Sequence, residues 1–482
     1  MSSRRRSPRD NGVRARSLST CLLASGVRNF SMAGSPGYAT IFDFSIQNLR
    51  FAAPGIRKPE AVVLPTSRRG LQRAVLCARS ASLAIRVRSG GHSYEGQSYT
   101  VSGGVLDGKA PFVVIDLMNL NKVRVHAASA TAWAESGATL GEVYHAVAHS
   151  SPSNRSSLAL TAASCSTIGL GGHISGGGFG PVSRKFMLAA DNVLDALLVD
   201  AVGRVLDRRA MGEDVFWAIR GGGGGSWGVV YAWKLRLVPV PDTVTVFTPR
   251  REGSVDAMAG LVYRWQFEDR DLRNVAFTGL VLGPKEMAMS VLNERFPELG
   301  LAEAEVSEMS WVESAARLAG LSSVDELHQQ AAILRYLSDG PPAGYVTMDP
   351  YGGAMARLSA TATPFPHRAG NLYALQYGVT WDSDAGEASV SARIQWLRSL
   401  YAYMTPHVSS NPRAAYVNYI DIDLMGFDES LGPVRLASSV SHARATWGAA
   451  YFTVENFDRL VRAKTRIDPA NVFYNAQSIP LH

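Results

Sequence analysis

Three glycine-rich clusters constrain the fold of this chain more than any other feature of its sequence. They occupy residues 89–91, 169–180 and 221–225, and each lies between segments with strand or helix periodicity. A single cluster of this kind can be a flexible linker. Glycine also lets a backbone approach a ligand closely, and successive N–H groups in such loops bind phosphate oxygens. Because all three clusters are embedded in regular structure, we expect them to hold a large phosphate-bearing cofactor.

The segments around these clusters predict a chain of mixed α and β structure. Strands are expected at 61–64, 83–88, 113–117, 131–135 and 229–238, because apolar residues alternate or cluster there. Ser67 is a candidate cap for a helix reaching residue 80, and Thr139 with Glu142 forms a capping box. A helix is also expected at 213–220, and further helices around 254–268, 323–338 and 440–467.

The distribution of prolines and the change of pattern along the chain predict four parts. We expect a disordered leader at 1–35, a cofactor-binding domain at 55–240, a second domain at 241–410 and a C-terminal segment at 411–482. The boundary near 240 rests on Pro239 and Pro241. A chain that begins one lobe, builds a second and returns to the first fits this order.

The positive charge of the chain is concentrated at its N-terminus. The 482 residues carry a formal net charge of +7, and the first 16 of them contain six Arg and one acidic residue. The rest has no basic stripe, so we expect no nucleic-acid partner. The Arg- and Ser-rich head lacks the apolar core of a signal peptide, so it is either a transit-like leader or a misassigned start. No apolar run approaches the ~18 residues of a membrane span.

Several familiar sites are excluded by context. Residues 223–228 match GxGxxG, but a predicted helix precedes them and a strand follows, the reverse of the dinucleotide-binding order. No GxxxxGK[ST] motif for a phosphate-binding loop is present. His145 and His149 lie one helical turn apart, as metal ligands can, but no third ligand follows in the sequence. We therefore expect a solvated helix face there and no metal.

The cysteine count allows at most one disulfide, because the chain contains only Cys21, Cys77 and Cys165. Two glycosylation sequons begin at Asn29 and Asn154. Each sequon is a short motif that also occurs by chance.

Long motifs give the chain a resemblance to a known family. RVRSGGHSYEG at 86–96 and CSTIGLGGH at 165–173 resemble the berberine bridge enzyme-like flavoproteins of plants, in the vanillyl-alcohol oxidase and p-cresol methylhydroxylase superfamily. The resemblance continues at 188–192, 214–221, 350–353, 364–368, 416–419, 458–465 and 477–480. It runs in one order from about residue 20 to the C-terminus. It implies an α+β fold, with a two-lobed FAD-binding domain of the PCMH type and a separate antiparallel-sheet substrate domain.

The resemblance also implies FAD bound through two covalent bonds. It assigns the 8α-methyl carbon of the isoalloxazine to His92 and the C6 position to Cys165. An imidazole nitrogen and a thiolate are both suitable nucleophiles. From the residues alone, a buried structural histidine and a small core cysteine are equally good interpretations. The residues assigned to the cofactor site are Arg88, Ser89, Gly90, Gly91, His92, Ser93, Cys165, Gly169, Gly171, Gly172, His173, Gly176 and Gly177.

Two further assignments come from the family. An N-terminal cysteine pairs with one on the first helix of the flavin domain, which corresponds to Cys21 and Cys77 and implies an oxidising compartment. This leaves Cys165 for the flavin. The resemblance therefore implies a secreted or cell-wall protein, although the Arg-rich start does not look like a secretory signal.

Family members oxidise alcohols or amines by passing hydride to the flavin while a base removes a proton. The position of the base corresponds to Tyr419, with Gln376 as a hydrogen-bond donor and with Tyr416 and Tyr94 lining the pocket. A free tyrosine has a pKa near ~10, so Tyr419 needs a stabilised phenolate to act near neutral pH. Each of these tyrosines could also be an ordinary core aromatic with a satisfied hydroxyl.

Three positions depart from the family pattern. Ala374 stands where some members have a lysine that stabilises tyrosinate, and Asp349 stands where asparagine is frequent. Both changes disfavour a phenolate at Tyr419. Ile168 is bulky at the position that borders the approach of oxygen to the flavin, so we expect slow reoxidation by O₂.

We expect a monomeric FAD-dependent oxidoreductase that oxidises an alcohol group of a carbohydrate or phenolic substrate. The electron acceptor is O₂ or another oxidant. An alternative in the same class is oxidative cyclisation of a specialised metabolite, such as an alkaloid. An alternative of a different class is a flavin-loaded secreted binding protein with weak activity, which Ala374 and Asp349 favour.

Overall fold

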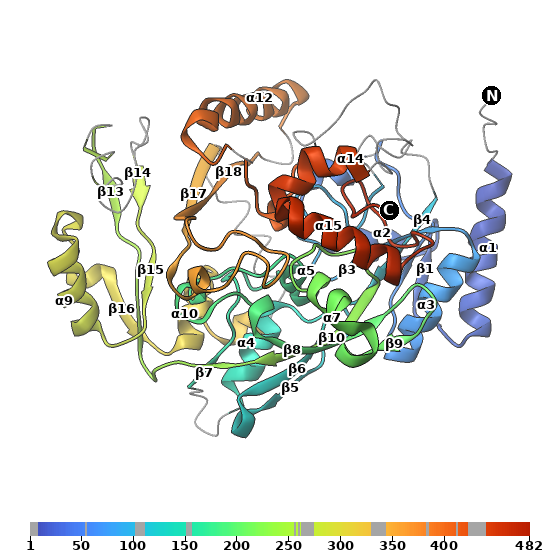
Figure 1. Cartoon of the computed structure of the whole chain (residues 1–482), viewed down its shortest axis with the longest axis horizontal. Helices are drawn as coiled ribbons and strands as arrows, with labels where there is room; N and C mark the ends of the chain where they lie inside the picture. The colour runs from blue at the N-terminus through green and yellow to red at the C-terminus, as the bar shows by residue number, and fades with distance from the viewer. Residues whose placement is uncertain are drawn as a thin grey trace.

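The protein is built of two lobes that contain both helices and sheets (Figure 1). The computed structural model describes residues 8–53, 55–101, 111–150, 157–254, 257–258, 261, 274–328, 344–381, 385–410, 413–422 and 440–482. The α+β fold class expected from the sequence is confirmed.

The first sheet is formed by the N-terminal part of the chain, in the strand order β1-β2-β4-β3. Its strands are β1 Phe30–Met32, β2 Ala61–Val63, β3 Ala84–Arg88 and β4 Phe112–Asp116. β2 and β3 run parallel to β4, and β1 runs antiparallel to β2. Helix α3 (Arg68–Ser80) begins at the expected cap, because the Ser67 side chain accepts a hydrogen bond from the N–H of Gly70.

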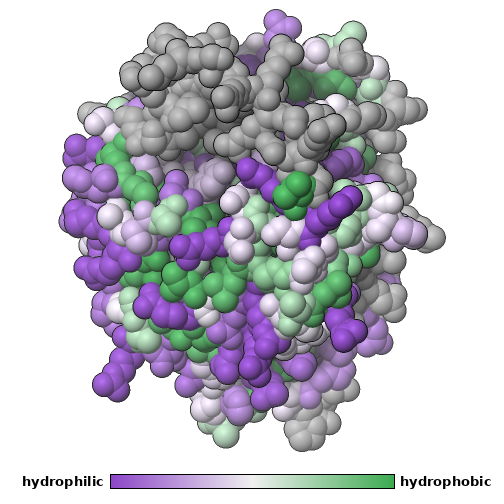
Figure 2. Space-filling model, turned by 90° about the vertical axis from the view of Figure 1, so that its right-hand side faces the viewer, coloured by the Kyte–Doolittle hydropathy of each residue, from purple (hydrophilic) through white to green (hydrophobic). Residues whose placement is uncertain are grey.

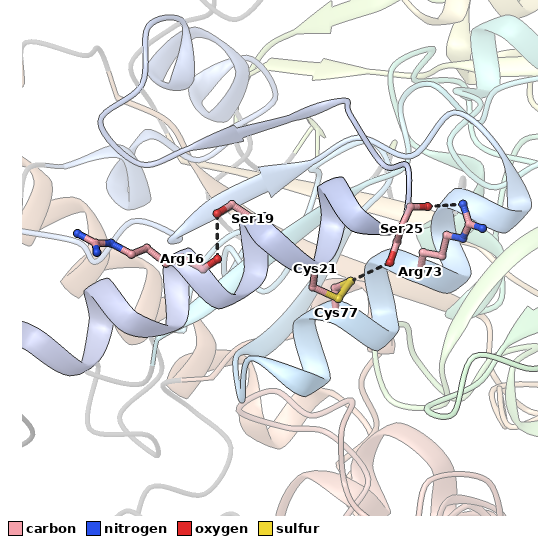
Figure 3. The surroundings of a disulfide bond; sticks show 6 residues. All are labelled: Arg16, Ser19, Cys21, Ser25, Arg73 and Cys77. Atoms are coloured by element: carbon pink, nitrogen blue, oxygen red, sulfur yellow. Dashed lines mark hydrogen bonds between the residues drawn. A yellow bond between two sulfur atoms is a disulfide. The ribbon is translucent and has the colours of Figure 1, made fainter.

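The N-terminal segment is not the disordered leader that its composition predicts. From Pro8 onward it forms helix α1 (Pro8–Ala24), and only residues 1–7 of the leader lie outside the described part at this end. Leu18 and Leu22 are fully buried in one apolar cluster with α3, and Cys21 forms a disulfide with Cys77 (Figure 3). The expectation failed because the charged first turns obscure the apolar residues and the cysteine that fix the later turns.

The face at the end of the molecule where α1 lies carries both hydrophilic and apolar side chains, with the apolar ones gathered mainly across its middle (Figure 2). Val13 and Leu23 of α1 and Leu76 of α3 are exposed large apolar residues of these two helices. None of the described helices combines the length and the apolar character that crossing a bilayer requires.

The second sheet is antiparallel throughout, in the order β5-β6-β10-β8-β9. Its strands are β5 Val123–His126, β6 Thr131–Glu135, β8 Val193–Val199, β9 Val205–Leu206 and β10 Val229–Arg236. Helices α4 (Leu140–Ala148) and α7 (Arg208–Ala218) pack on it, and the capping box of Thr139 and Glu142 opens α4 as expected. The glycines at 221–225 follow α7 and precede β10, which confirms the rejection of a dinucleotide fingerprint.

The C-terminal segment packs on α7, the helix that lies against β8 and β9 of this second sheet (Figure 1). It contains α14 (Val440–Ala443), a π-helical turn (Arg444–Gly448) and α15 (Ala449–Ile467). Arg459 of α15 forms an ion pair with Asp214 of α7, with 3.0 Å between Nη2 and Oδ1. The Lys464 Nζ lies 2.7 Å from the Asp468 Oδ2, and it also donates to the carbonyl of Ser226, beside the third glycine cluster. This buried pair fixes the end of the chain against the glycine cluster.

The second lobe contains small antiparallel sheets, as the sequence predicts for a substrate domain. Its strands are β12 Val244–Phe247, β13 Arg250–Glu252, β14 Asn274–Ala276, β15 Gly279–Val281, β16 Val306–Met309, β17 Gly344–Pro350 and β18 Tyr373–Val379. They pair as β15-β12-β16, β13-β14 and β17-β18. The longer helices of this lobe are α9 Lys285–Arg295, α10 Trp311–Leu318 and α12 Glu387–Met404.

Most of the two helices predicted around 254–268 and 323–338 lies outside the described residues; Asp325–His328 is a 3₁₀ turn, η6. The remaining short helices and strands are α2 Tyr38–Asp43, α5 Leu170–Ser175, α6 Ser183–Phe186, β7 Leu158–Ala159 and β11 Val238–Pro239.

Candidate functional site

The three glycine clusters meet around one cavity of about 290 Å³. Gly90 and Gly169 touch through their backbones, because a Cβ on Gly90 would lie 2.3 Å from the Gly169 nitrogen. The N–H of Gly223 donates to the carbonyl of Ser175, at the end of α5. The contact between Gly90 and Gly169 leaves no room for a side chain, and the Gly223 hydrogen bond joins the third cluster to the second, so the clusters are parts of one packed site.

Most residues predicted for the cofactor line this cavity. They are Ser89, Gly90, Gly91, His92, Ser93, Gly169, Gly171, Gly172 and His173. Gly172 has no atom within 4 Å of the position where a Cβ would lie, so its backbone faces open space. His173 is buried, which lowers its pKa to about 4, and its Nε2 accepts a hydrogen bond from the Ala163 N–H.

The two predicted nucleophiles lie on either side of one threonine. The Thr167 Oγ1 is 2.9 Å from the His92 Nε2 and 3.7 Å from the Cys165 Sγ. Burial lowers the pKa of His92 to about 4, so its imidazole is neutral at physiological pH. Cys165 has a free thiol, but it is not among the residues that line the cavity. Thr167 was not singled out from the sequence; its position two residues after Cys165 was the available signal.

Three other predicted cofactor residues do not line the cavity. Arg88 is fully buried, its Nε lies 2.6 Å from the Asp116 Oδ2, and it donates to backbone carbonyls of α2. It therefore holds α2 against the first sheet. Gly176 makes room for Asn418, whose Oδ1 would lie 1.9 Å from a Cβ at that position, and Gly177 has a positive φ of 122°. Gly176 thus seats the segment that carries Tyr416 and Tyr419, whereas Gly177 faces the ring of Phe365.

The chemistry of the cavity wall fits the expected FAD. Among the described residues, the buried hydroxyls of Ser98 and Ser136 have no hydrogen-bond partner, and both residues line the cavity. An unpaired buried hydroxyl is costly, so these groups call for a polar ligand. Glycine backbone along the wall and a neutral histidine beside a thiol complete a donor set suited to a flavin nucleotide.

A second cavity, of about 1210 Å³, adjoins the first and belongs to the second lobe. Tyr94, Tyr416 and Tyr419 line both cavities. The ring centroids of Tyr416 and Tyr419 are 5.0 Å apart, and those of Tyr94 and Tyr419 are 6.0 Å apart. The predicted catalytic tyrosines are thus brought together at the boundary between a cofactor space and a larger substrate space.

Hydrogen bonds orient each of these rings. Gln376 of β18 donates to the Tyr94 hydroxyl at 2.6 Å. The Tyr416 hydroxyl accepts from the Gly178 N–H at 3.1 Å and from Asn418 at 2.9 Å. Burial raises the pKa of Tyr94 to about 12 and also raises the pKa of Tyr416. Both residues are therefore neutral phenols at physiological pH.

Tyr419 is paired with a carboxyl group. Its hydroxyl donates to the Asp349 Oδ2 over 3.5 Å. Burial, followed by the charge of Asp349, raises the pKa of Tyr419 well above its ordinary value. Burial also raises the pKa of Asp349, and the hydrogen bond from Tyr419 opposes that rise. The pair therefore carries its negative charge on the carboxylate rather than on the phenol.

The two sequence departures near Tyr419 are direct neighbours. Asp349 on β17 and Ala374 on β18 are cross-strand partners in register. Directly opposed residues in an antiparallel pair lie within side-chain contact, so a lysine at 374 would lie beside the carboxylate. This chain has the carboxylate without that lysine. Ile168, the third departure, lines the cofactor cavity.

Family models match two separate parts of the chain. A model described as FAD binding domain matches residues 59–208, and a model described as berberine and berberine like matches residues 415–480. The first covers two of the three glycine clusters, and the second covers the Tyr416–Tyr419 motif.

Curated proteins and solved structures match the chain over nearly its full length. A berberine bridge enzyme-like protein D-2 of Nicotiana tabacum is 46% identical, covering 98% of this chain and 93% of that protein. A reticuline oxidase of Eschscholzia californica is 43% identical, covering 96% and 91%. The solved berberine bridge enzyme of Eschscholzia californica superimposes with a TM-score of 0.87, at 43% identity, over 96% of this chain and 99% of that chain. A solved BBE-like protein of Arabidopsis thaliana gives a TM-score of 0.85 at 36% identity, over 97% of this chain and 100% of that chain.

Proposed function

Since the chain belongs to the berberine bridge enzyme-like family of FAD-dependent oxidoreductases, we propose that it oxidises an alcohol group of a phenolic or carbohydrate substrate held in the second cavity. The observation that carries the proposal is the wall of Tyr94, Tyr416 and Tyr419 shared by the two cavities. A substrate in the larger cavity meets the cofactor at this wall, beside the Tyr419–Asp349 pair.

The glycine-lined cavity is where the chain holds FAD, which supplies the hydride acceptor. His92 and Cys165 are the residues proposed to form the two covalent bonds, because the family motif and the shared contact with Thr167 put both beside one loop. A depressed pKa of about 4 keeps His92 unprotonated and nucleophilic above that pH. Covalent attachment at His92 is therefore expected to be independent of pH between about 5 and 8.

Asp349 is proposed as the final proton acceptor, in place of a tyrosinate at Tyr419. The negative charge of the pair lies on the carboxylate, and the Tyr419 hydroxyl points to it. The substrate hydroxyl donates its proton to the Tyr419 oxygen while the Tyr419 proton passes to Asp349. This transfer leaves Tyr419 neutral throughout and fits the absence of a lysine at 374.

The lining of the second cavity favours a phenolic alcohol over a carbohydrate. It is rich in aromatic side chains: Tyr345, Tyr351, Tyr373, Tyr377, Trp381, Tyr401 and Tyr403. Aromatic faces bind a planar phenol by stacking and by edge contacts. Relatives differ in substrate, because one is named a reticuline oxidase and a variant of another is described as a glucose oxidase.

Anaerobic stopped-flow spectroscopy tests the proposal directly. The purified yellow protein is mixed with coniferyl alcohol, with an oligosaccharide or with coniferyl alcohol methylated at its side-chain alcohol oxygen. The flavin absorbance is followed in each case. Bleaching by the alcohol but not by its ether supports alcohol oxidation. A protein that stays yellow with every alcohol contradicts the proposal and favours a flavin-loaded binding protein.

We also propose that the protein passes through the secretory pathway. The disulfide between Cys21 and Cys77 requires an oxidising compartment, and Asn29 of the first sequon is exposed. Asn154 of the second sequon lies outside the described residues. Treatment of the protein from its native tissue with an N-glycosidase is expected to lower its mass, and an unchanged mass together with free thiols at both positions would contradict secretion.

A further inference from the structure

The structure supplies a third ligand for the histidine pair on α4. His145 and His149 lie one turn apart at the C-terminal end of this helix, with ring centroids 3.9 Å apart. Asp325, at the start of the 3₁₀ turn Asp325–His328, lies beside them. One potential ligand atom from each of the three residues falls within 4.8 Å of the other two, and no other such group of three occurs among the described residues.

We propose that His145, His149 and Asp325 bind a divalent transition-metal cation of the Zn²⁺ class. Two imidazole nitrogens and one carboxylate oxygen are a donor set that suits Zn²⁺ better than Ca²⁺ or Mg²⁺, which prefer oxygen ligands. Zn²⁺ bonds of about 2.0–2.2 Å put ligand atoms within about 3.5 Å of one another. Because His149 and Asp325 are exposed, small side-chain rotations can close the remaining gap.

The hydrogen bonding of His149 prepares it as a ligand. Its Nδ1 lies 2.8 Å from the carbonyl oxygen of His145. A carbonyl can only accept, so Nδ1 carries the proton and Nε2 keeps its lone pair for a metal. Second-shell bonds of this kind commonly fix the tautomer of metal-bound histidines. The C-terminal end of α4 also carries the partial negative charge of the helix dipole, which favours a cation.

A metal at this site would join the two lobes. α4 belongs to the cofactor lobe, while Asp325 follows α10 of the second lobe. The two parts already touch next to the site, because the rings of Tyr144 and Trp311 are 5.1 Å apart. The Tyr144 hydroxyl donates to the carbonyl of Ala163, which lies two residues before Cys165. The cation would therefore hold the second lobe against the helix that supports the cofactor loop.

Zinc binding by the purified holoprotein, freed of its affinity tag and treated with chelator, tests the proposal. Isothermal titration with Zn²⁺ alone is expected to show one site per chain. His149→Ala and Asp325→Asn are each expected to weaken binding by about 100-fold or more, because each removes one of three ligands. His126→Ala removes an exposed histidine that is not one of the three proposed ligands and is the matched control, with unchanged binding expected.

Two further measurements separate loss of the site from loss of the fold. Zn²⁺ is expected to raise the melting temperature of the wild type and of His126→Ala but not of Asp325→Asn, while all three melt alike in chelator. The visible spectrum of bound Co²⁺ should show tetrahedral or five-coordinate geometry in the wild type and in His126→Ala but not in Asp325→Asn. Equal zinc affinity in the wild type, His149→Ala and Asp325→Asn overturns the proposal. The flavin and substrate activity play no part in these measurements, so their outcome is independent of the proposed function.

Discussion

The two cavities differ in the groups that form their walls. The wall of the cofactor cavity includes backbone at positions where a side chain would collide, as Gly90 against Gly169 shows. The substrate cavity is walled by side chains from β17, β18 and α12, many of them aromatic. A backbone-walled space tolerates little change, whereas a side-chain-walled space can be reshaped one residue at a time. The former should therefore determine whether the protein carries its cofactor, and the latter which substrate it takes.

The largest effect on stability and flavin content is expected from adding a methyl group to the wall of the cofactor cavity. Gly90→Ala places a Cβ 2.3 Å from the Gly169 nitrogen, so we expect destabilisation by at least about 3 kcal/mol and loss of bound flavin. Gly55→Ala is the control, since no atom lies within 4 Å of its Cβ position. Flavin absorbance per protein measures the effect. If Gly90→Ala binds a full complement of flavin and is as stable as the control, the close backbone contact at Gly90 does not restrict this position to glycine.

Removal of the carboxylate beside Tyr419 is the next largest effect. Asp349→Asn is expected to lower the rate of flavin reduction by about 10²–10⁴-fold, the usual contribution of a general base, with flavin content unchanged. If the Tyr419 phenolate were the base, the same change would remove a negative charge and speed the reaction. A faster Asp349→Asn enzyme would thus reverse the assignment.

The pH dependence of reduction follows from the same pair. The pKa of Asp349 is raised by burial, and only its ionised form accepts a proton, so the rate should fall as pH drops through that raised pKa. Ala374→Lys puts a cation opposite Asp349 and is expected to move this acid limb to lower pH. If the acid limb of the pH profile stays at the same pH in Ala374→Lys, the limb does not arise from the titration of Asp349.

A smaller effect is expected at the part of the cofactor wall that is made by a side chain. Ile168→Ala opens space beside the cofactor and should speed reoxidation of the reduced flavin by O₂ by about tenfold, or ~1.4 kcal/mol. Stopped-flow mixing of the reduced enzyme with oxygenated buffer measures this rate. An unchanged rate would mean that Ile168 does not restrict oxygen.

The smallest effect belongs to the substrate wall. Trp381→Ala is expected to raise KM for a phenolic alcohol by about three- to tenfold, the value of one aromatic contact, with flavin content and stability unchanged. Steady-state kinetics with an artificial acceptor measure KM and kcat separately. Loss of flavin in this variant would show that the substrate wall also determines whether the cofactor is retained.

The cofactor side could be predicted from sequence because its determinants are local. The motifs at 86–96 and 165–173 contain their own glycines and nucleophiles, and each contributes a run of nearby residues to the wall of the cavity. Arg88 shares a motif with His92, but its side chain leaves the cavity to pair with Asp116. Arg88 ends β3 whereas His92 lies in the loop after it, so membership of a motif does not fix the role of each residue.

Other contacts depend on residues far apart in the chain and were not predictable. Asp325 lies 176 positions after His149, and no local pattern links them. Asn418 fits into the space left by Gly176, a relation that only the folded chain shows. The N-terminal helix was missed because its stability comes from Leu18, Leu22 and a disulfide rather than from composition.

The hairpin of β17 and β18 has a consequence for how such a protein can diversify. It carries Asp349 and Gln376 and also much of the aromatic lining of the second cavity, yet within the described residues its two strands pair only with each other. Exchange of residues 344–381 between homologues would thus transfer the proposed proton acceptor and much of the proposed substrate-binding wall as one module. Selection could then change which substrate is oxidised without changing the residues that retain the flavin.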